Sequence, residues 1–129
     1  MAKIEGVCKE VIEKSEWVAI ATAGTDGPHV VGCWTRNICA LGIEEKTLMI
    51  PAWRFHKTEE NLRQNSRVEL LFASLQVERP DGHGQGCSIS GMGEIQTSGK
   101  TAEAVKAKFP WARGVLIVHV IETKVHLGE

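Results

Sequence analysis

The sequence predicts a mainly β (α+β) fold, in which a closed antiparallel barrel carries short flanking helices. The predicted elements follow the order α-β-β-β-α-β-β-α-β, with hairpin-like links and no βαβ repeat, which argues against a Rossmann sheet. Glycines interrupt the alternating stretch of residues 87–96, as they do in a bent strand of a small barrel. The length of 129 residues, without a linker or internal repeat, predicts a single domain spanning residues 1–129.

The first predicted elements are a helix and a hairpin. Residues 2–14 should form the helix, because its apolar side chains recur along one stripe: Ile4, Val7, Cys8, Val11 and Ile12. Residues 17–23 are nearly all apolar and rich in β-formers, which predicts a well-buried strand. A Gly-Thr-Asp-Gly turn leads into a second strand at residues 29–34, so these two strands should pair.

The rest of the chain should alternate between strands and short helices. Four further strands are expected, at residues 47–50, 67–73, 87–96 and 114–126. Two further helices are expected, at residues 59–65 and 101–108. Residues 35–41 should continue in extended form, and residues 42–46 should make a turn. Residues 75–86 hold Pro80 and several glycines, which predicts a loose connection.

Charge and cysteine usage narrow the class of protein. Fifteen basic against sixteen acidic residues leave no basic face, so nucleic acid and acidic membrane surfaces are poor partners. The four cysteines show neither a CxxC pair nor zinc-ligand spacing: Cys8, Cys33, Cys39 and Cys87. The N-terminus does not resemble a signal peptide and no apolar stretch approaches a membrane span, so we expect a cytoplasmic protein with reduced thiols. No histidine spacing indicates a metal site.

The junction at residues 48–61 carries the main candidate site. A short apolar run ends at Pro51, crosses an aromatic and basic loop, and enters a polar helix at Lys57 and Thr58. The free backbone N–H groups of such a helix start suit a phosphate, and these two side chains add a positive charge and a hydroxyl. A solvated lysine followed by a threonine helix cap is the alternative interpretation.

Flat apolar side chains surround this junction. Trp53 and Phe55 lie in the loop, and Trp34 ends a strand shortly after Gly32, where a small residue lets a ligand approach the backbone. A phosphate site beside aromatic walls is what flavin mononucleotide (FMN) requires. The alternatives are a core tryptophan for Trp34 and an aromatic plug at a barrel end for Trp111.

Three segments resemble the FMN-binding split-barrel family, the group related to pyridoxamine-5′-phosphate oxidase. They are VAIATAGTDGPHVV (residues 18–31), HKTEEN (residues 56–61) and KFPWARGVL (residues 108–116). The resemblance covers nearly the whole chain, from Val18 to Leu127. It implies a six-stranded split barrel, a homodimer, and one FMN per subunit in a groove at the subunit interface.

The resemblance also assigns roles to positions of this sequence. Lys57 and Thr58 match the phosphate-binding pair, the strand end at residues 32–34 would run along the flavin, and residues 51–53 would face the ring edge. Trp111 matches an aromatic close to the ring. The expected cofactor-binding residues are Gly32, Cys33, Trp34, Pro51, Ala52, Trp53, Arg54, His56, Lys57, Thr58 and Trp111. No catalytic residue and no metal ligand is assigned.

Four positions depart from the family pattern. Gly32 and Cys33 stand where Asn and Thr are expected, so one hydrogen-bonding side chain is lost and a weak thiol donor remains. Trp53 and Arg54 replace a glycine pair, and we expect Arg54 either to stabilise reduced anionic flavin or to join the phosphate site. The turn at residues 44–45 is longer by two residues. FMN binding is still expected, while its affinity and the reduction potential stay open.

The expected function is that of an FMN-binding flavoprotein that exchanges electrons with an unknown redox partner, or of a small flavin-dependent oxidoreductase. Pyridoxamine-phosphate oxidase activity is not expected, because no C-terminal extension carries the arginine and histidine that bind that substrate. Two alternatives remain open. One is an NAD(P)H-dependent flavin reductase-type enzyme, and the other is a non-catalytic split-barrel module that binds haem, another cofactor or nothing.

Overall fold

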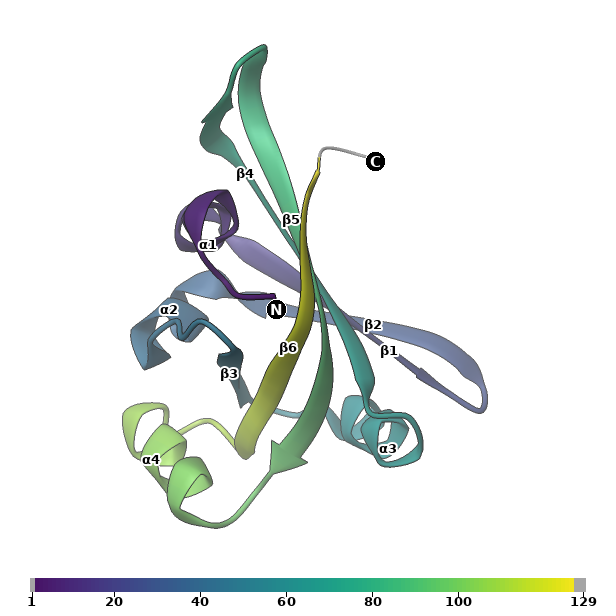
Figure 1. Ribbon diagram of the computed structural model, residues 1–129. Coiled ribbons are helices and arrows are strands. Elements are labelled where there is room, and N and C mark those ends of the chain that lie inside the picture. The colour runs from purple at the N-terminus through teal and green to yellow at the C-terminus, as the bar shows by residue number, and fades with distance from the viewer. Residues whose placement is uncertain (1, 127–129) are drawn as a thin grey trace.

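Six antiparallel strands form one strongly curled sheet in the order β2-β1-β4-β5-β6-β3 (Figure 1). This computed structural model describes residues 2–126, so Leu127, where the family resemblance ends, lies outside the described residues. The strands are β1 (Trp17–Gly24), β2 (Gly27–Trp34), β3 (Thr47–Ala52), β4 (Arg67–Arg79), β5 (Gly82–Gln96) and β6 (Gly114–His126). The edges β2 and β3 do not pair, so the sheet is a half-barrel and the expectation of full closure is wrong. The mainly β split-barrel prediction is confirmed.

Four short helices flank this sheet. They are α1 (Gly6–Lys14), α2 (Thr35–Leu41), α3 (His56–Gln64) and α4 (Lys100–Lys108). Helix α1 packs on β4, α2 on β3, α3 on β1 and α4 on β6. Within residues 2–126, no helix is both long and apolar enough to cross a membrane.

The concave face of the sheet and the apolar stripe of α1 form the main core. Alternate residues of the central strands point into it and are fully buried: Val18, Ile20, Leu70, Phe72 and Ile89. Val11 and Ile12 of α1 cover them and are also fully buried. Each such side chain contributes about 1.5–3 kcal/mol of hydrophobic stabilisation. The core therefore fixes the edge strands β2 and β3, between which the candidate site lies.

Residues 35–41 form helix α2, so the prediction that they continue the strand is wrong. Thr35 and Ile38 are both fully buried. Residues three apart share a face of a helix but lie on opposite faces of a strand, so only the helix buries both. This turn of the chain carries Arg36 and Asn37, which were not among the expected site residues.

Residues 75–86 are not a loose connection, because β4 and β5 run through them as a long hairpin that projects past α1 (Figure 1). The turn falls at Pro80 and Asp81, where the side chains of Arg79 and Asp81 form an ion pair. The Arg79 side chain also donates to the Gly84 carbonyl at 2.9 Å. Gly84 has a φ of +99°, which L side chains rarely adopt. Gly84 therefore supplies a backbone conformation that the paired hairpin requires, and it does not make this segment loose.

The structure joins Cys8 of α1 to Cys87 of β5 in a disulfide that spans 79 positions of sequence. The expectation that all four thiols are reduced is therefore wrong for this pair. Sequence spacing could not reveal the pair, because it depends on α1 packing across the concave face of the sheet. Cys33 and Cys39 remain free thiols.

Candidate functional site

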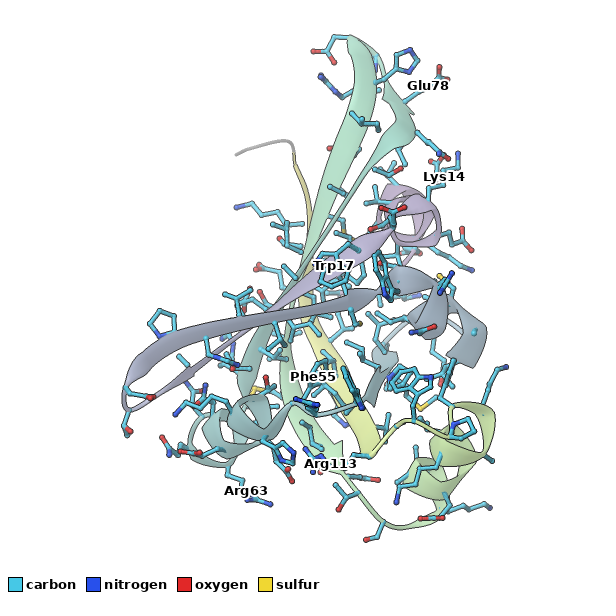
Figure 2. All side chains as sticks on the ribbon, turned by 180° about the vertical axis from the view of Figure 1, so that it is seen from behind. Lys14, Trp17, Phe55, Arg63, Glu78 and Arg113 are labelled. Carbon is cyan, nitrogen blue, oxygen red and sulfur yellow. A yellow bond between two sulfur atoms is a disulfide. The ribbon has the colours of Figure 1, made fainter. Side chains whose placement is uncertain are left out.

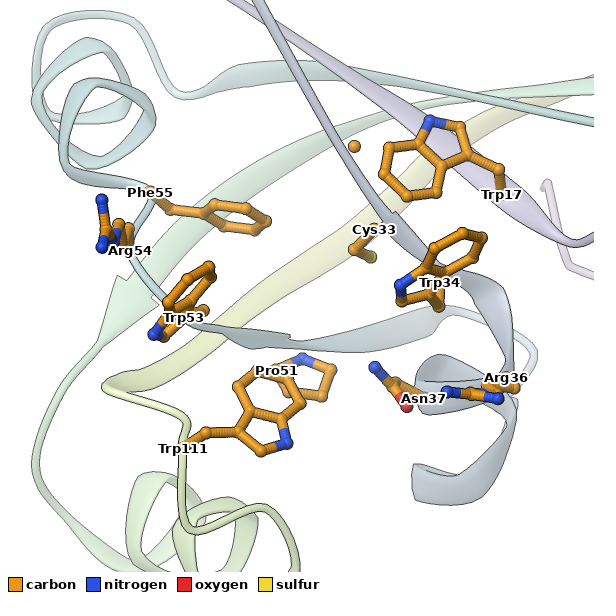
Figure 3. A pocket seen from close by; sticks show the side chains of 11 residues that line it. Trp17, Cys33, Trp34, Arg36, Asn37, Pro51, Trp53, Arg54, Phe55 and Trp111 are labelled. Atoms are coloured by element: carbon orange, nitrogen blue, oxygen red, sulfur yellow. The ribbon is translucent and has the colours of Figure 1, made fainter.

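A cavity of about 600 Å³ opens where the edge strands β2 and β3 face one another (Figure 3). We call it the aromatic pocket, because all four tryptophans of the chain line it. Its lining residues are Trp17, Gly32, Cys33, Trp34, Arg36, Asn37, Pro51, Trp53, Arg54, Phe55 and Trp111. Its volume lies within the range of small-molecule sites in proteins. Among the residues that the structure describes, no carboxylate lines it, and its two charged groups, Arg36 and Arg54, are both cationic.

The pocket brings together seven of the eleven residues that the sequence singled out. These are Gly32, Cys33, Trp34, Pro51, Trp53, Arg54 and Trp111. Ala52 is fully buried behind the wall, in the β3 pairing with Gly114. His56, Lys57 and Thr58 lie on the first turn of α3, beyond the pocket lining. The site thus has an aromatic part and a separate polar part at the start of α3.

Trp17 and Trp34 form one wall of the aromatic pocket. They are opposite one another at the open end of the β1–β2 hairpin, and their rings meet edge to face with centroids 4.8 Å apart. A side chain at position 32 would collide with the Trp17 indole. Gly32 is therefore the residue that makes room for Trp17, which explains why a polar side chain is missing from this strand end.

The turn between β3 and α3 forms the opposite wall and is clamped by Arg113, the residue immediately before β6. Arg113 donates two hydrogen bonds to the Arg54 carbonyl, from Nε at 3.0 Å and Nη2 at 2.6 Å. Its Nη1 pairs with Glu59 Oε1 at 2.9 Å. Phe55 has a φ of +55°, an unusual conformation for a residue other than glycine. Figure 2 shows Phe55 and Arg113 at the same end of the molecule. The clamp holds this strained turn, and with it Trp53, in place.

Positive charge enters the pocket from two sides. The Arg54 guanidinium lies over the Trp53 ring, 4.6 Å from its centroid, a distance typical of a cation–π contact. Arg36 projects from α2 at the other side, next to Asn37 (Figure 3). The Cys33 thiol lines the same pocket. Burial raises its pKa to about 12, so this thiol stays protonated at neutral pH. Cys33 therefore contributes a neutral thiol to the wall of the pocket.

Lys57 is the cation at the start of α3, and carboxylates already surround it. Its ammonium lies 2.8 Å from Asp26 Oδ2 and 3.6 Å from Glu60 Oε1. The hydrogen bond with Asp26 raises the pKa of Lys57, and the same contact lowers the pKa of Asp26. An arriving anion must therefore compete with Asp26 for this ammonium group.

Two polar atoms of α3 are buried without a hydrogen-bond partner, Thr58 Oγ1 and Asn61 Oδ1. The Asn61 amide nitrogen does donate to Thr22 Oγ1 at 3.2 Å. Leaving a buried polar group unsatisfied costs about 1–3 kcal/mol. Thr58 lies in the first turn of α3, where the helix N–H groups are also free, and this combination indicates a polar partner from outside residues 2–126. In the present conformation Thr58 is fully buried, so a ligand reaches its hydroxyl only if the side chains above it move.

Three lining residues were missed as site residues, Trp17, Arg36 and Asn37, whereas Phe55 was expected beside the site but was not assigned to the cofactor. Trp17 could have been found by counting back from the Gly24–Gly27 turn, because the hairpin register places it opposite Trp34. Arg36 and Asn37 were hidden by the wrong extended prediction for residues 35–41.

The chain is similar to known proteins over most of its length. The sequence model of a family described as pyridoxamine 5'-phosphate oxidase matches residues 4–124. An FMN-binding protein from Nitratidesulfovibrio vulgaris strain Miyazaki F is 35% identical over 121 residues, which cover 94% of this chain and 97% of the relative.

Solved structures share the fold. HupZ of Group A Streptococcus superposes with a TM-score of 0.70 and 22% identity, covering 93% of this chain and 91% of that one. An FMN-binding protein from Syntrophomonas wolfei gives a TM-score of 0.63 and 13% identity, covering 94% and 90%. At these identities the likeness shows the fold alone.

Proposed function

The chain belongs to the pyridoxamine 5'-phosphate oxidase family, and from this premise we propose that it is an FMN-binding flavoprotein that acts in electron transfer or as a small flavin-dependent oxidoreductase. The 35% identical relative is named for FMN binding, and the alignment covers nearly all of both chains. The observation that carries the proposal is the meeting of four tryptophans around one pocket beside a helix start. A flat, largely apolar ring with an anionic tail matches that combination.

The aromatic pocket suits the isoalloxazine ring. Flat side chains on several sides can stack on the ring or meet its edge, and they exclude water from it. Arg54 brings positive charge to the same pocket, which favours electron-rich, reduced flavin. When bound, FMN supplies the redox chemistry, and these residues supply position and electrostatics.

The start of α3 suits the phosphate. The first-turn N–H groups of a helix are free to bind an anion, and Lys57 adds an ammonium group once it leaves Asp26. The orphaned Thr58 hydroxyl would gain the partner that it lacks within the protein. Arg54 lies in the turn between β3 and α3, so it connects the proposed phosphate site at the start of α3 to the aromatic pocket proposed for the flavin ring.

We further propose that a second copy of the chain covers the mouth of the pocket. Trp17, Val30 and Leu71 lie on the convex face of β1, β2 and β4 and are 48%, 63% and 49% exposed. Trp17 belongs both to this apolar face and to the pocket, so a copy seated there would also contact the flavin. The net charge of −1 offers little repulsion between copies. We also propose a cytoplasmic location, in which the Cys8–Cys87 disulfide would be an exception to the reduced thiols of that compartment.

The test is cofactor uptake. Purified protein is incubated with FMN, passed through a desalting column, and its visible spectrum and subunit stoichiometry are recorded. We expect flavin bands at one FMN per chain, with riboflavin retained roughly 10- to 100-fold less tightly because it lacks the phosphate. Protein that leaves the column colourless would refute the proposal. NADH oxidation by the loaded protein then separates a reductase from an electron carrier.

A further inference from the structure

Two of the six arginines differ from the others in having no carboxylate partner within residues 2–126. The other four all form ion pairs: Arg63 and Arg113 with Glu59, Arg67 with Glu69, and Arg79 with Asp81. The two exceptions, Arg36 and Arg54, both line the aromatic pocket. Both arginines are also solvent-exposed, so the pocket presents two cations that no carboxylate of the described chain engages and that an incoming anion can reach.

The proposed flavin accounts for only one of them. Arg54 lies in the turn that leads into α3, so its charge serves the end where the phosphate is proposed to bind. Arg36 comes from α2 and lies across the pocket from Arg54, beside Asn37 (Figure 3). The Arg36 and Asn37 side chains have no hydrogen-bond partner in the described part of the chain. These donors are therefore available to a second anionic group on this side of the pocket.

A second cavity adjoins the pocket at this point. It has a volume of about 410 Å³ and is lined by Ser15, Glu16, Trp34 and Arg36. Trp34 and Arg36 line both cavities, so a ligand could rest its ring on Trp34 and reach Arg36 with its polar end. Glu16 makes no ion pair with Arg36, and its negative charge on the second cavity opposes a ligand with two carboxylates.

We propose that Arg36 and Asn37 form a subsite for the carboxylate of a planar aromatic monocarboxylate, whose ring packs against Trp34 beside the flavin. A guanidinium group matches a carboxylate with two parallel hydrogen bonds, and the Asn37 amide can add a third donor. The indole supplies the apolar surface for the ring. The inference rests on the proposed function, because the flavin shares the pocket with this ligand.

The experiment titrates FMN-loaded protein with naphthoate and with its neutral counterpart naphthamide. Binding is followed by calorimetry and by the change in the flavin absorption bands. We expect naphthoate to perturb the bands and to bind roughly 10- to 100-fold more tightly than naphthamide, the effect of hydrogen bonds to a charged group. The flavin should remain bound throughout the titration.

Three variants assign the effect to Arg36. Arg36→Gln should reduce naphthoate affinity to that of naphthamide, with a far smaller change in FMN affinity. Arg36→Lys should keep part of the preference, because the charge remains while the paired geometry is lost. Arg79→Gln removes the same charge from the distant β4–β5 hairpin and should change neither ligand's affinity.

Several outcomes would overturn the inference. Equal binding of the two probes, no binding of either, or an unchanged preference in Arg36→Gln would each do so. Displacement of FMN by naphthoate would show a shared flavin site, and a change in oligomeric mass in Arg36→Gln would make Arg36 an interface residue. If the protein takes up no FMN, the same titration followed by tryptophan fluorescence still tests Arg36. A preference for naphthoate that is lost in Arg36→Gln would then support this inference even though the proposed function had failed.

Discussion

The two parts of the candidate site differ in how their charges are balanced. The aromatic pocket is open, and both of its arginines lack a carboxylate partner in the described chain. The start of α3 has its ammonium group engaged by Asp26 and Glu60, and two polar atoms are buried without partners. The pocket can receive a ring without rearrangement, whereas the helix start must exchange one anion for another.

This difference separates two properties of a flavin site. Preformed apolar walls set which ring fits, because they need no reorganisation. Competition at Lys57 sets how much of the phosphate attraction appears as affinity, because breaking the Asp26 contact offsets part of the gain. Changes at the helix start should therefore alter affinity, and changes in the pocket should alter the properties of the bound ring.

Lys57→Ala should have the largest effect on FMN affinity. Loss of the ammonium group should weaken binding roughly 10- to 100-fold, as expected for a hydrogen bond to a charged group. Fluorescence titration with FMN measures the change. Lys9→Ala, at an exposed position on α1, is the matched control and should bind as wild type does. Wild-type affinity in Lys57→Ala would mean that the phosphate binds elsewhere.

Arg113→Gln should weaken FMN binding by about 3- to 10-fold, because the turn that carries Trp53 and Arg54 loses its clamp. Limited proteolysis should also cut this turn faster. The control is Arg63→Gln, since Arg63 pairs with Glu59 but does not reach the turn. If both variants weaken binding equally, the effect belongs to Glu59 and not to the clamp.

Asp26→Asn should tighten FMN binding, by about 2- to 5-fold, because the phosphate no longer competes with a carboxylate for Lys57. The same titration measures it, and raising the salt concentration should shrink the gain. Weaker binding in this variant would show that Asp26 orients Lys57 for the ligand.

Trp34→Ala should change the bound flavin more than its affinity. Three other tryptophans still line the pocket, so affinity should fall by about twofold, the low end for one aromatic contact. Flavin fluorescence and reduction potential should shift clearly, and Trp34→Phe should shift them less. An unchanged spectrum and potential would remove Trp34 from the ring site.

Cys33→Ser should have the smallest effect on the site, and its effect should appear in how the stability of the protein depends on pH. Its folded pKa of about 12 lies above the ordinary value of 9.0, so the folded state holds the thiol proton more tightly than the unfolded state does. The resulting stability is complete below pH 9.0 and is lost as the pH rises toward about 12. Urea unfolding of wild type and Cys33→Ser across this range should show wild type losing stability faster. Parallel pH profiles would place the thiol in contact with water.

The six strands and the pairing of β1 with β2 could be predicted from the sequence because their signals are local, whereas long-range pairings such as β3 with β6 could not. The Gly24–Gly27 turn and the alternation in β4 are visible in the residues themselves. Helix α2 could not be predicted, because its seven residues are too few for a clear period and burial of Ile38 decides their conformation. The β4–β5 hairpin was missed because glycine fits a strained strand as well as a loop.

The candidate site shows the same division between local features, which the sequence reveals, and long-range contacts, which it does not. Trp34, Pro51 and Trp111 share one pocket in the structure, and the family resemblance had implied that they lie at one site. Asp26 could not be linked to Lys57 from sequence, because the contact joins the β1–β2 turn to α3 across 31 positions. Arg113 was likewise quoted only as part of a motif. Its hydrogen bonds to the Arg54 carbonyl depend on how β6 pairs with β3.

The close approach of Trp17 to Gly32 also restricts the order in which these positions can mutate. Any residue larger than glycine at position 32 meets the indole, so a side chain can be gained there without displacing the ring only after Trp17 has become smaller. The reverse order passes through an intermediate whose strand end or indole is forced out of place. A polar side chain at position 32 is therefore reached most easily by two substitutions in order, Trp17 first, and single-site libraries built on this chain would score position 32 as poorly tolerant while Trp17 remains.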